Sequence, residues 1–447
     1  MRAGMDVVRL NFSHSTHEEH ARTIAAIRAV SGRHEKPLAI LADLSGPKIR
    51  TGRLAGGRAV ALHAGQRFTL TTKAVAGDLR GVSTNYLRLP REIRRGDRIL
   101  LADGLIELRV TGTSSREVHT VVVNGGDLGE HKGINLHSVR LRVSALTAKD
   151  RRDLAFALAH GANYVAVSFV RRASDVEAAR TAIRRAGGDT PVIAKLEKPE
   201  AIENLDEILR ASDGVMVARG DLGVEMNPEK VPVVQKQIIA RARDFRLPVI
   251  TATQMLESMT QNPRPTRAEA SDVANAIFDG TDAVMLSAET ATGRYPREAV
   301  AMMDRIIREA EASGHIFVRP RPTAELNVAE TISEAVCHAA EELRMKVIAV
   351  FTESGSTARL ISKYRPRSPI IAFSPNHETR RRLSLLWGVT ARSIRPVRDI
   401  DGLTKLADER LLEEKFVRKG DVVGIVAGTP LGTRGTTNLM KLHTVGR

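Results

Sequence analysis

Short apolar runs alternate with amphipathic stretches along most of this 447-residue chain. The pattern is clearest in the segment 191–225. There, an apolar run at 192–194 is followed by apolar positions at helical spacing between 202 and 209, and then by a second apolar run at 215–217. This order predicts one βαβ unit of a parallel sheet. Both runs stop at charged residues, and parallel α/β folds carry their chemistry at the carboxyl ends of the strands.

The same alternation extends from the N-terminus to about residue 290 and is interrupted once. Seven predicted strands end in polar residues, at 5–14, 38–41, 163–168, 192–196, 214–218, 248–252 and 283–286. Helices are predicted at 16–29, 148–159, 228–245 and 267–278. Seven such units are one short of a closed (β/α)₈ TIM-type barrel. Because the opening MRAGMDVV resembles the end of a helix that leads into a strand, we expect the first strand to lie upstream of Met1, which makes the chain N-terminally truncated.

The segment that interrupts the alternation has a different residue pattern. Residues 49–143 are rich in glycine and in short alternating runs, without helical periodicity of useful length. Residues 102–104, Ala-Asp-Gly, predict a hairpin turn between two such runs. We therefore expect an all-β lid domain at 49–143, inserted between barrel segments at 1–48 and 144–318.

Pro320 and Pro322 indicate a linker to a third domain, at 319–447, which again has α/β alternation. Its helices are predicted at 327–343, 356–364, 376–386 and 402–416, and its strands at 346–351, 369–373, 421–426 and 438–445. Two of its loops are polar: TESGST at 352–357 and GTPLGTRGTT at 428–437. The first follows a strand and opens a helix, an arrangement that suits an anion. Hydroxyl groups that merely cap the helix explain it equally well.

Composition places the chain among ordinary globular proteins, with 42% hydrophobic and 27% charged residues. No apolar run approaches the ~20 residues of a membrane span, and the N-terminus resembles neither a signal peptide nor a transit peptide. The single cysteine, Cys337, lies in a helical pattern, as expected for a cytoplasmic protein without disulfides.

The net charge of +16 raises the question of nucleic-acid binding. However, the basic residues are dispersed, and aromatic residues make up only 3% of the chain, too few for a base-stacking surface. The charge is better explained by anionic small-molecule substrates, so no nucleic-acid partner is expected.

Candidate chemistry lies at the ends of two neighbouring predicted strands. Glu197 and Asp221 offer two hard oxygen ligands to an ion of the size of magnesium. Lys195 lies beside them, and a fixed ammonium next to a divalent cation suits a phosphoryl group. The alternative is a structural ion pair between Lys195 and Glu197; the recurrence of polar residues at every strand end favours the functional interpretation.

Eight longer runs of the sequence together carry a further signal: VVRLNFSHSTHEEH, DLSGPKIRTG, ADGLIEL, VIAKLEKPEAIENLDEIL, SDGVMVARGDLGVE, TATQMLESM, PTRAEASDVANAIFDGTDAVMLSAET and TESGSTARLISKYRPRSPIIAFSP. On these runs the chain resembles the pyruvate kinase family over essentially its whole length. The resemblance implies a glycolytic transferase of the cytoplasm that moves a phosphoryl group from phosphoenolpyruvate to ADP, giving pyruvate and ATP. It also implies Mg²⁺ or Mn²⁺ as cofactor, a phosphorylated allosteric effector and a homotetramer.

The resemblance also assigns roles to individual residues. Lys195 would stabilise the transferring phosphoryl group, while Glu197 and Asp221 would hold magnesium. The substrate would be contacted by Arg9, Gly220, Asp221 and Thr253, and the nucleotide phosphates would lie near Asn11, Ser13, His14, Arg50 and Lys132. Thr253 and Ser287 are the hydroxyls within range of the enolate, and either could supply its proton. The effector phosphate would bind Thr352, Ser354, Ser356 and Thr357.

Three departures from the family pattern affect these expectations. The missing first strand normally carries a Gly-Pro turn near the nucleotide. Ser15 stands where relatives usually have glycine. Leu44, Ser45 and Lys48 stand where the animal enzymes carry Thr, Lys and Glu.

The third departure concerns the monovalent-cation site. In the potassium-dependent branch, residues that match Asn11, Ser13, Asp43 and the carbonyl of Leu44 hold potassium. Here the Lys48 ammonium is expected to take its place, so that potassium is not required. Alternatively, Lys48 pairs with Asp43 or with a carboxylate of the lid.

Two other functional classes remain open on sequence grounds. Phosphoenolpyruvate mutases and 2-keto-acid aldolases also handle enolates and magnesium on a barrel, but they lack the inserted β domain and the third domain. The non-enzyme alternative is a truncated, inactive or regulatory chain that binds only effectors.

Overall fold

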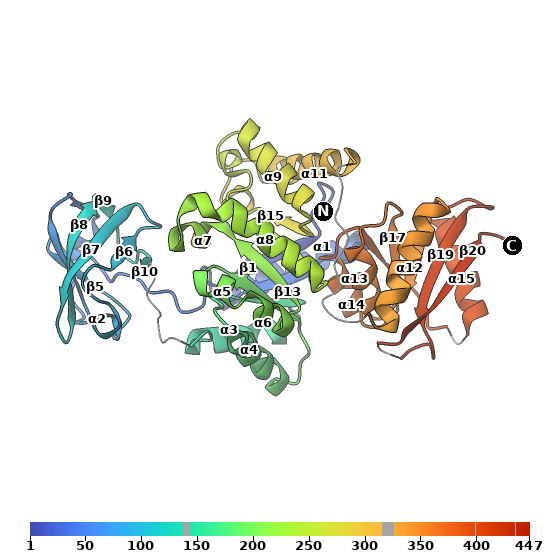
Figure 1. Cartoon of the computed structure of the whole chain (residues 1–447), viewed down its shortest axis with the longest axis horizontal. Coiled ribbons are helices and arrows are strands. Elements are labelled where there is room, and N and C mark those ends of the chain that lie inside the picture. Colours follow the sequence, from blue (N-terminus) through green and yellow to red (C-terminus); the bar gives the residue numbers. More distant parts are fainter. Residues whose placement is uncertain (137–143, 315–325, 398, 434) are drawn as a thin grey trace.

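The structure, a computed structural model, describes residues 1–136, 144–314, 326–397, 399–433 and 435–447. A β domain, a central α/β domain and a C-terminal α/β domain lie in a row (Figure 1). The predicted linker at Pro320 and Pro322 and the end of the predicted lid at 137–143 lie outside the described residues.

The central sheet contains seven parallel strands, which confirms the predicted barrel-type fold. In spatial order they are β1 (Val7–Asn11), β2 (Ala39–Asp43), β11 (Tyr164–Val167), β12 (Val192–Leu196), β13 (Gly214–Ala218), β14 (Val249–Ala252) and β15 (Ala283–Met285). Val7 of β1 and Met285 of β15, at opposite ends of this order, pack against one inner hydrophobic cluster. The sheet is therefore curled around a shared interior.

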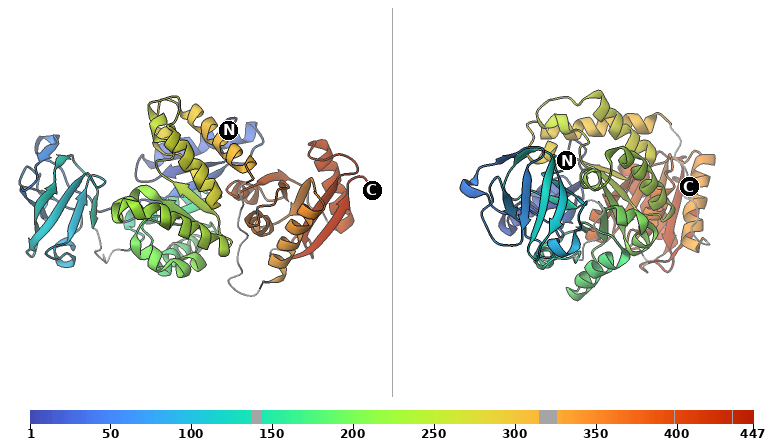
Figure 2. Two further views of the ribbon diagram at one scale, coloured as in Figure 1. Left: turned by 45° about the horizontal axis from the view of Figure 1, so that its top comes forward. Right: turned by 60° about the vertical axis from the view of Figure 1, so that its left-hand side comes forward.

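Helices cover the outer face of this sheet (Figure 2). They are α1 (His17–Arg33), α3 (Ala148–Ala159), α4 (Ala173–Arg185), α5 (Pro199–Glu203), α6 (Leu205–Ala211), α8 (Val231–Asp244), α9 (Arg267–Asp279) and α11 (Pro296–Ala312). Three of them begin with capping boxes, in which Thr16, Thr147 or Thr266 exchanges hydrogen bonds with the acidic residue three positions later. The helical stretch predicted across 202–209 is present, but it is divided into α5 and α6 at Asn204, which leaves helical geometry and whose amide donates to the carbonyl of Arg171.

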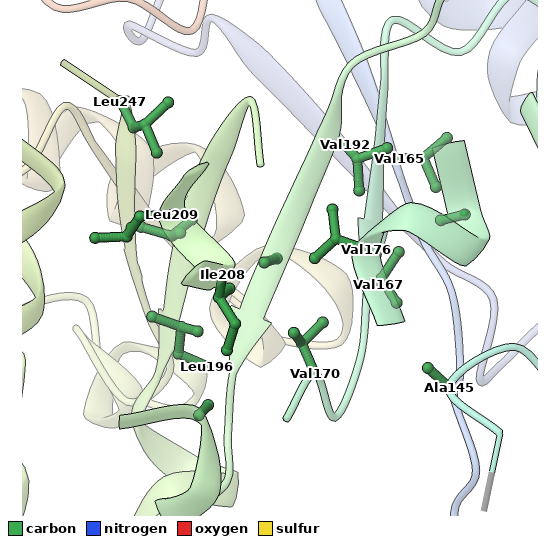
Figure 3. Close-up of a cluster of buried hydrophobic side chains, with 14 of the residues drawn as sticks. Ala145, Val165, Val167, Val170, Val176, Val192, Leu196, Ile208, Leu209 and Leu247 are labelled. Atoms are coloured by element: carbon green, nitrogen blue, oxygen red, sulfur yellow. The ribbon is translucent and has the colours of Figure 1, made fainter. Parts of the chain in front are cut away.

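Alternation along β12 explains how its polar residue reaches the interior. Val192, Ala194 and Leu196 belong to the large cluster between sheet and helices, part of which Figure 3 shows. Ile193 belongs to the inner cluster. Because successive side chains point to opposite faces of a strand, Lys195 shares the inner side with Ile193.

The β domain contains a sheet in the order β10 (Ile134–Leu136), β6 (Arg98–Leu101), β7 (Ile106–Thr113), β8 (Glu117–Asn124), β4 (Arg67–Thr71) and β5 (Gly81–Ser83), and a separate pair, β3 (Val60–Leu62) and β9 (Gly126–Leu128). The predicted hairpin turn is confirmed, because Leu101 pairs with Ile106 and residues 102–104 all have positive φ. A short helix that the sequence analysis did not predict, α2 (Leu89–Glu92), packs its buried Leu89 into the domain core.

The C-terminal sheet has the order β18 (Val389–Ser393), β17 (Ile370–Ser374), β16 (Val347–Phe351), β19 (Val422–Gly428) and β20 (Thr437–Thr444), with β20 antiparallel. Its helices are α12 (Val328–Glu342), α13 (Ser356–Lys363), α14 (His377–Leu383) and α15 (Ile400–Glu413). Strand β18 was missed, because its only apolar residues are Val389 and Ala391.

The C-terminal domain packs against the end of the barrel where the strands begin. Leu385, which follows α14, joins the inner cluster of the barrel. Tyr164, the first residue of β11, donates its hydroxyl hydrogen to the carbonyl of Arg382 at 2.7 Å. Lys363, at the end of α13, pairs at 2.6 Å with Asp282, just before β15. The opposite end of the barrel, where the strands finish, faces the β domain.

Candidate active site

Lys195 lies at the centre of the polar rim of the barrel. Its Nζ donates to the Ser168 hydroxyl oxygen at 2.8 Å and lies 2.8 Å from Glu197 Oε1 and 3.2 Å from Asp43 Oδ1. These groups come from the ends of three neighbouring strands, β2, β11 and β12. Asp221 lies one strand further along, in α7 (Arg219–Glu225), which directly follows β13.

Burial and mutual charge govern this group. Glu197 is fully buried, and burial raises its pKa to about 7 even though Lys195 opposes the shift. For Asp43, burial alone would raise the pKa, but the cations Lys195 and Arg9 outweigh it and leave the pKa below its usual range. For Lys195, nearby carboxylates likewise outweigh burial and raise the pKa, so the ammonium stays charged.

Two of these carboxylate oxygens are suited to a cation. Glu197 Oε1 and Asp43 Oδ1 are buried and have no partner other than the Lys195 ammonium among the described residues, while Glu197 Oε2 accepts from the backbone N–H of Phe169 at 2.7 Å. The described residues contain no cluster of three acidic, His or Cys ligands. Asp221 is close enough to Glu197 for its charge to raise the pKa of that carboxyl, and it lines the cavity at this rim. Magnesium usually keeps several waters and uses one or two carboxylates plus substrate oxygens, so Glu197 and Asp221 fit that donor set.

The first two strands contribute the residues expected around the phosphates. Asn11 lies opposite Asp43 in the register, and its Oδ1 accepts from the backbone N–H of Ser13 at 3.1 Å. The Arg9 guanidinium donates to Asp43 Oδ2 at 2.8 Å. The resemblance assigns Arg9 to the substrate phosphate and Asp43 to the monovalent cation. Because these two side chains are in contact, the two expected sites would be adjacent.

A cavity of about 410 Å³ lies between the barrel rim and the β domain, lined by residues that include His14, Lys48, Arg50, Lys132 and Asp221. Burial lowers the pKa of His14, and the nearby cations Lys48, Arg50 and Arg9 lower it further. The imidazole is therefore neutral. The Lys48 Nζ lies 6.0 Å from the centroid of the Phe169 ring. Within the described part of the chain, no ion pair links Lys48 to Asp43 or to a carboxylate of the β domain.

Thr253 and Ser287 lie at the ends of β14 and β15. Thr253 has φ +79°, and its methyl group would lie only 2.7 Å from a Cβ atom added to Gly220, so glycine is required there. The Ser287 N–H donates to Glu289 Oε2 at 2.6 Å, and Glu289 Oε1 accepts from the N–H of Leu256. Glu289 therefore ties together the two strand ends that carry these hydroxyls.

The two polar loops of the C-terminal domain, predicted separately, face one cavity. The Thr357 and Thr437 hydroxyls are 2.6 Å apart, and those of Ser354 and Ser356 are 3.1 Å apart. Helix α13 has Gly355 as its N-cap, without a side-chain capping bond. The Ser354 hydroxyl accepts a long hydrogen bond, 3.5 Å, from the N–H of Ser356, the first residue of α13, and Thr352 accepts from the N–H of Gly355.

Sequence reasoning missed several contacts of the site. Ser168 was recognised only as the end of a strand, although it binds Lys195. Glu225, which is 2% exposed, accepts from Lys198 at 2.6 Å and from Asn135 of the β domain at 2.9 Å through the same oxygen. A lone glutamate in the run GVEM, near the end of a short helix, was the only available signal.

Comparisons with known proteins agree with this geometry. Family models described as the pyruvate kinase barrel domain and the pyruvate kinase alpha/beta domain match residues 1–300 and 330–443. Pyruvate kinases of Sporosarcina psychrophila and Geobacillus stearothermophilus are each 46% identical to the chain, over 99% and 100% of it and 77% of their own lengths. A crystal structure of a pyruvate kinase from Cryptosporidium parvum superposes with a TM-score of 0.91 at 37% identity, covering 99% of this chain and 92% of that one.

Proposed function

The chain belongs to the pyruvate kinase family of phosphotransferases, and from that premise we propose that it transfers the phosphoryl group of phosphoenolpyruvate to ADP in the cavity between the barrel and residues 49–143. The observation that carries this assignment is the position of Lys195. Its ammonium lies among buried carboxylates and is the sole partner of Glu197 Oε1 and Asp43 Oδ1 within the described residues. Asp221, which lines that cavity, is close enough for its charge to act on the same ammonium.

In the proposed reaction the bond between the phosphoryl group and the enol oxygen breaks, and a new bond forms to the terminal oxygen of ADP. Phosphoryl transfer requires mainly positioned positive charge, which Lys195, Arg9 and Arg50 supply. Glu197 and Asp221 would hold Mg²⁺ or Mn²⁺, which when bound supplies Lewis-acid stabilisation of the enolate oxygen. The released enolate then takes up a proton at its methylene carbon, for which Thr253 and Ser287 offer the nearby hydroxyls.

Substrate and nucleotide would be held by different parts of the rim. Gly220, Asp221 and Thr253 would contact the substrate carboxylate, and Arg9 its phosphate. The nucleotide phosphates would lie near Asn11, Ser13, His14, Arg50 and Lys132. Closure of the β domain over the rim would exclude water that could otherwise accept the phosphoryl group.

We also propose that the enzyme does not require potassium. A lysine ammonium is a tethered unit charge, so Lys48 can supply the positive field beside the phosphates without an ion having to bind. A free potassium ion close to Lys48 would instead meet repulsion of ~4 kcal/mol at 4 Å with an effective dielectric of 20. Asp43 pairs with Arg9 and Lys195, so the proposal for Lys48 is supported by the departures at Leu44, Ser45 and Lys48 from the potassium-dependent pattern.

The remaining proposals concern assembly, regulation and location. A homotetramer and a phosphorylated effector at the 352–357 loop follow from family membership, and a cytoplasmic site of action is consistent with the single free cysteine. No helix in the described residues is long and apolar enough to cross a membrane.

One assay tests the function and its ion requirement together. ADP-dependent pyruvate formation would be measured with Mg²⁺ in a tetramethylammonium buffer free of sodium and potassium. We expect turnover without potassium, because Lys48 supplies the positive charge. Adding potassium should change the rate by less than about twofold, which corresponds to ~0.4 kcal/mol in the activation free energy. If the enzyme shows no turnover either with or without potassium, the proposed enzyme activity is contradicted. A rate that rises tenfold or more with potassium would contradict only the role of Lys48.

A further inference from the structure

Thr253 has a backbone conformation that β-branched residues rarely adopt. Its φ is +79°, and that of the following Gln254 is +54°. Strained conformations of this kind persist only where surrounding contacts hold them, and they concentrate at functional sites. The contacts that hold Thr253 are therefore part of the construction of the site.

Arg219 makes the main polar contacts with this turn. It is the first residue of α7, after the neighbouring strand β13. Its Nη2 donates to the carbonyl of Thr253 at 2.7 Å and its Nε to the carbonyl of Ala252 at 3.3 Å. Because the guanidinium is planar and its donors are fixed relative to one another, two successive carbonyls are held together.

The other side of the guanidinium is also fixed. Arg219 Nη1 donates to Asp272 of α9 at 2.7 Å, and the Arg219 side chain is only 13% exposed. The next two residues along the chain are Gly220, which lies against the Thr253 side chain, and Asp221. Arg219 therefore links the first turn of helix α7, which contains Asp221, to the end of β14, where Thr253 lies.

We infer that Arg219 is a positioning residue for the reaction: it fixes the Thr253 hydroxyl relative to the Gly220–Asp221 turn without contacting the substrate. The inference rests on the proposed function, in which Thr253 and Asp221 face the same substrate. Loss of the guanidinium releases the strained turn, and a displacement of about 1 Å at a reacting group costs about 100-fold in rate.

A double-mutant cycle tests this inference. Turnover and the KM for phosphoenolpyruvate are measured for wild type, Arg219→Met, Thr253→Val and the double variant. We expect Arg219→Met to lower kcat about 100-fold while KM changes less than about threefold. Because Arg219 acts through Thr253, the double variant should stay within about threefold of Thr253→Val alone. Losses that multiply in the double variant, or a kcat of Arg219→Met close to wild type, overturn the inference.

Controls separate positioning from folding. Arg241→Met removes a comparable bidentate ion pair with Asp206, elsewhere on the barrel, and should leave kcat unchanged. Mn²⁺ affinity without substrate, measured by electron paramagnetic resonance, should be the same in Arg219→Met and wild type; a large loss would mean that the turn itself has collapsed and would overturn the inference. If Arg219→Met does not fold, Arg219→Lys replaces it in the cycle, with the same criteria. An inactive wild-type enzyme would contradict the proposed function instead.

Discussion

At the scale of single residues, Lys195 and the proposed metal ligands have separable tasks. The ammonium is expected to stabilise charge on the transferring phosphoryl group, whereas enolate stabilisation is expected to depend on Glu197 and Asp221 through the metal they would hold. Lys195→Met should therefore lower phosphoryl transfer about 1,000-fold, while exchange of the methyl protons of bound pyruvate with solvent persists. Both reactions can be followed on one preparation, transfer by ATP formation and exchange by proton NMR in D₂O. Equal loss of the two would contradict this division.

A second residue-scale prediction concerns Lys48. Replacing it by glutamate removes the tethered cation and supplies an acidic neighbour for a free one, so Lys48→Glu should create a potassium requirement. We expect its rate to rise at least about tenfold, or ~1.4 kcal/mol, on addition of potassium. Lys73→Glu, at a half-exposed lysine that pairs with Glu117 in the β domain, controls for the change of charge. A Lys48→Glu enzyme with the same rate in both buffers would mean that Lys48 does not occupy the cation site.

At the scale of elements, the loop before α13 is the proposed effector site. Ser354→Asp places a carboxylate among its hydroxyls, and like-charge repulsion should abolish activation by a phosphorylated ligand. Rates at low phosphoenolpyruvate would be compared with and without sugar phosphates and nucleoside monophosphates. If none of these compounds changes the wild-type rate, the loop has only a structural role.

A buried carboxylate of the barrel contacts the β domain. Glu225 Oε1 accepts from Asn135 of β10 and from Lys198, next to Glu197. Hydrogen bonds to charged groups contribute about 1.5–3 kcal/mol, so Asn135→Ala should shift the β domain toward an open position by about tenfold or more. Water would then compete with ADP, and pyruvate formed should exceed ATP formed. Asn124→Ala, at an exposed residue of β8, is the matched control. Equal amounts of pyruvate and ATP from Asn135→Ala would show that the contact between Asn135 and Glu225 does not hold the β domain closed.

The elements also show where sequence reasoning succeeds. Strands β12 and β13 were predictable because each is a buried apolar run that ends in charged residues, and their adjacency brought Lys195, Glu197 and Asp221 to one rim. The contact between Lys195 and Ser168 was not predictable, since it joins different strands and depends on side-chain direction. The positive φ of Thr253 could not be predicted from the sequence either, because a threonine does not indicate a left-handed conformation. Strand β18 was missed because it contains only two apolar residues, Val389 and Ala391, and Asn204 interrupts a helix through a tertiary contact with Arg171.

At the scale of the whole molecule, the barrel and the C-terminal domain share a buried ionic junction. Lys363 and Asp282 are almost completely buried and lie 2.6 Å apart, and Arg365 adds a second contact to Asp282 at 3.3 Å. Trp387, the single tryptophan of the chain, lies at the same junction. Its ring lies 4.4 Å from the Arg365 guanidinium, and its Nε1 donates to Glu311 of the barrel at 2.6 Å. Tryptophan fluorescence, excited selectively over that of the four tyrosines, therefore reports on this junction.

Asp282→Asn should weaken the junction strongly. It leaves the Lys363 ammonium buried without its counter-charge, and breaking a buried pair in this way costs about 3–5 kcal/mol. We expect the fluorescence of Trp387 to shift to the red at a lower temperature than in wild type, before the loss of helical circular dichroism, because the domains separate before they unfold. Arg308→Gln removes an exposed ion pair with Asp304 on α11 and should change stability by less than about 1 kcal/mol. Identical fluorescence transitions in Asp282→Asn and wild type would show that apolar packing around Leu385, rather than the ion pair, holds the two domains together.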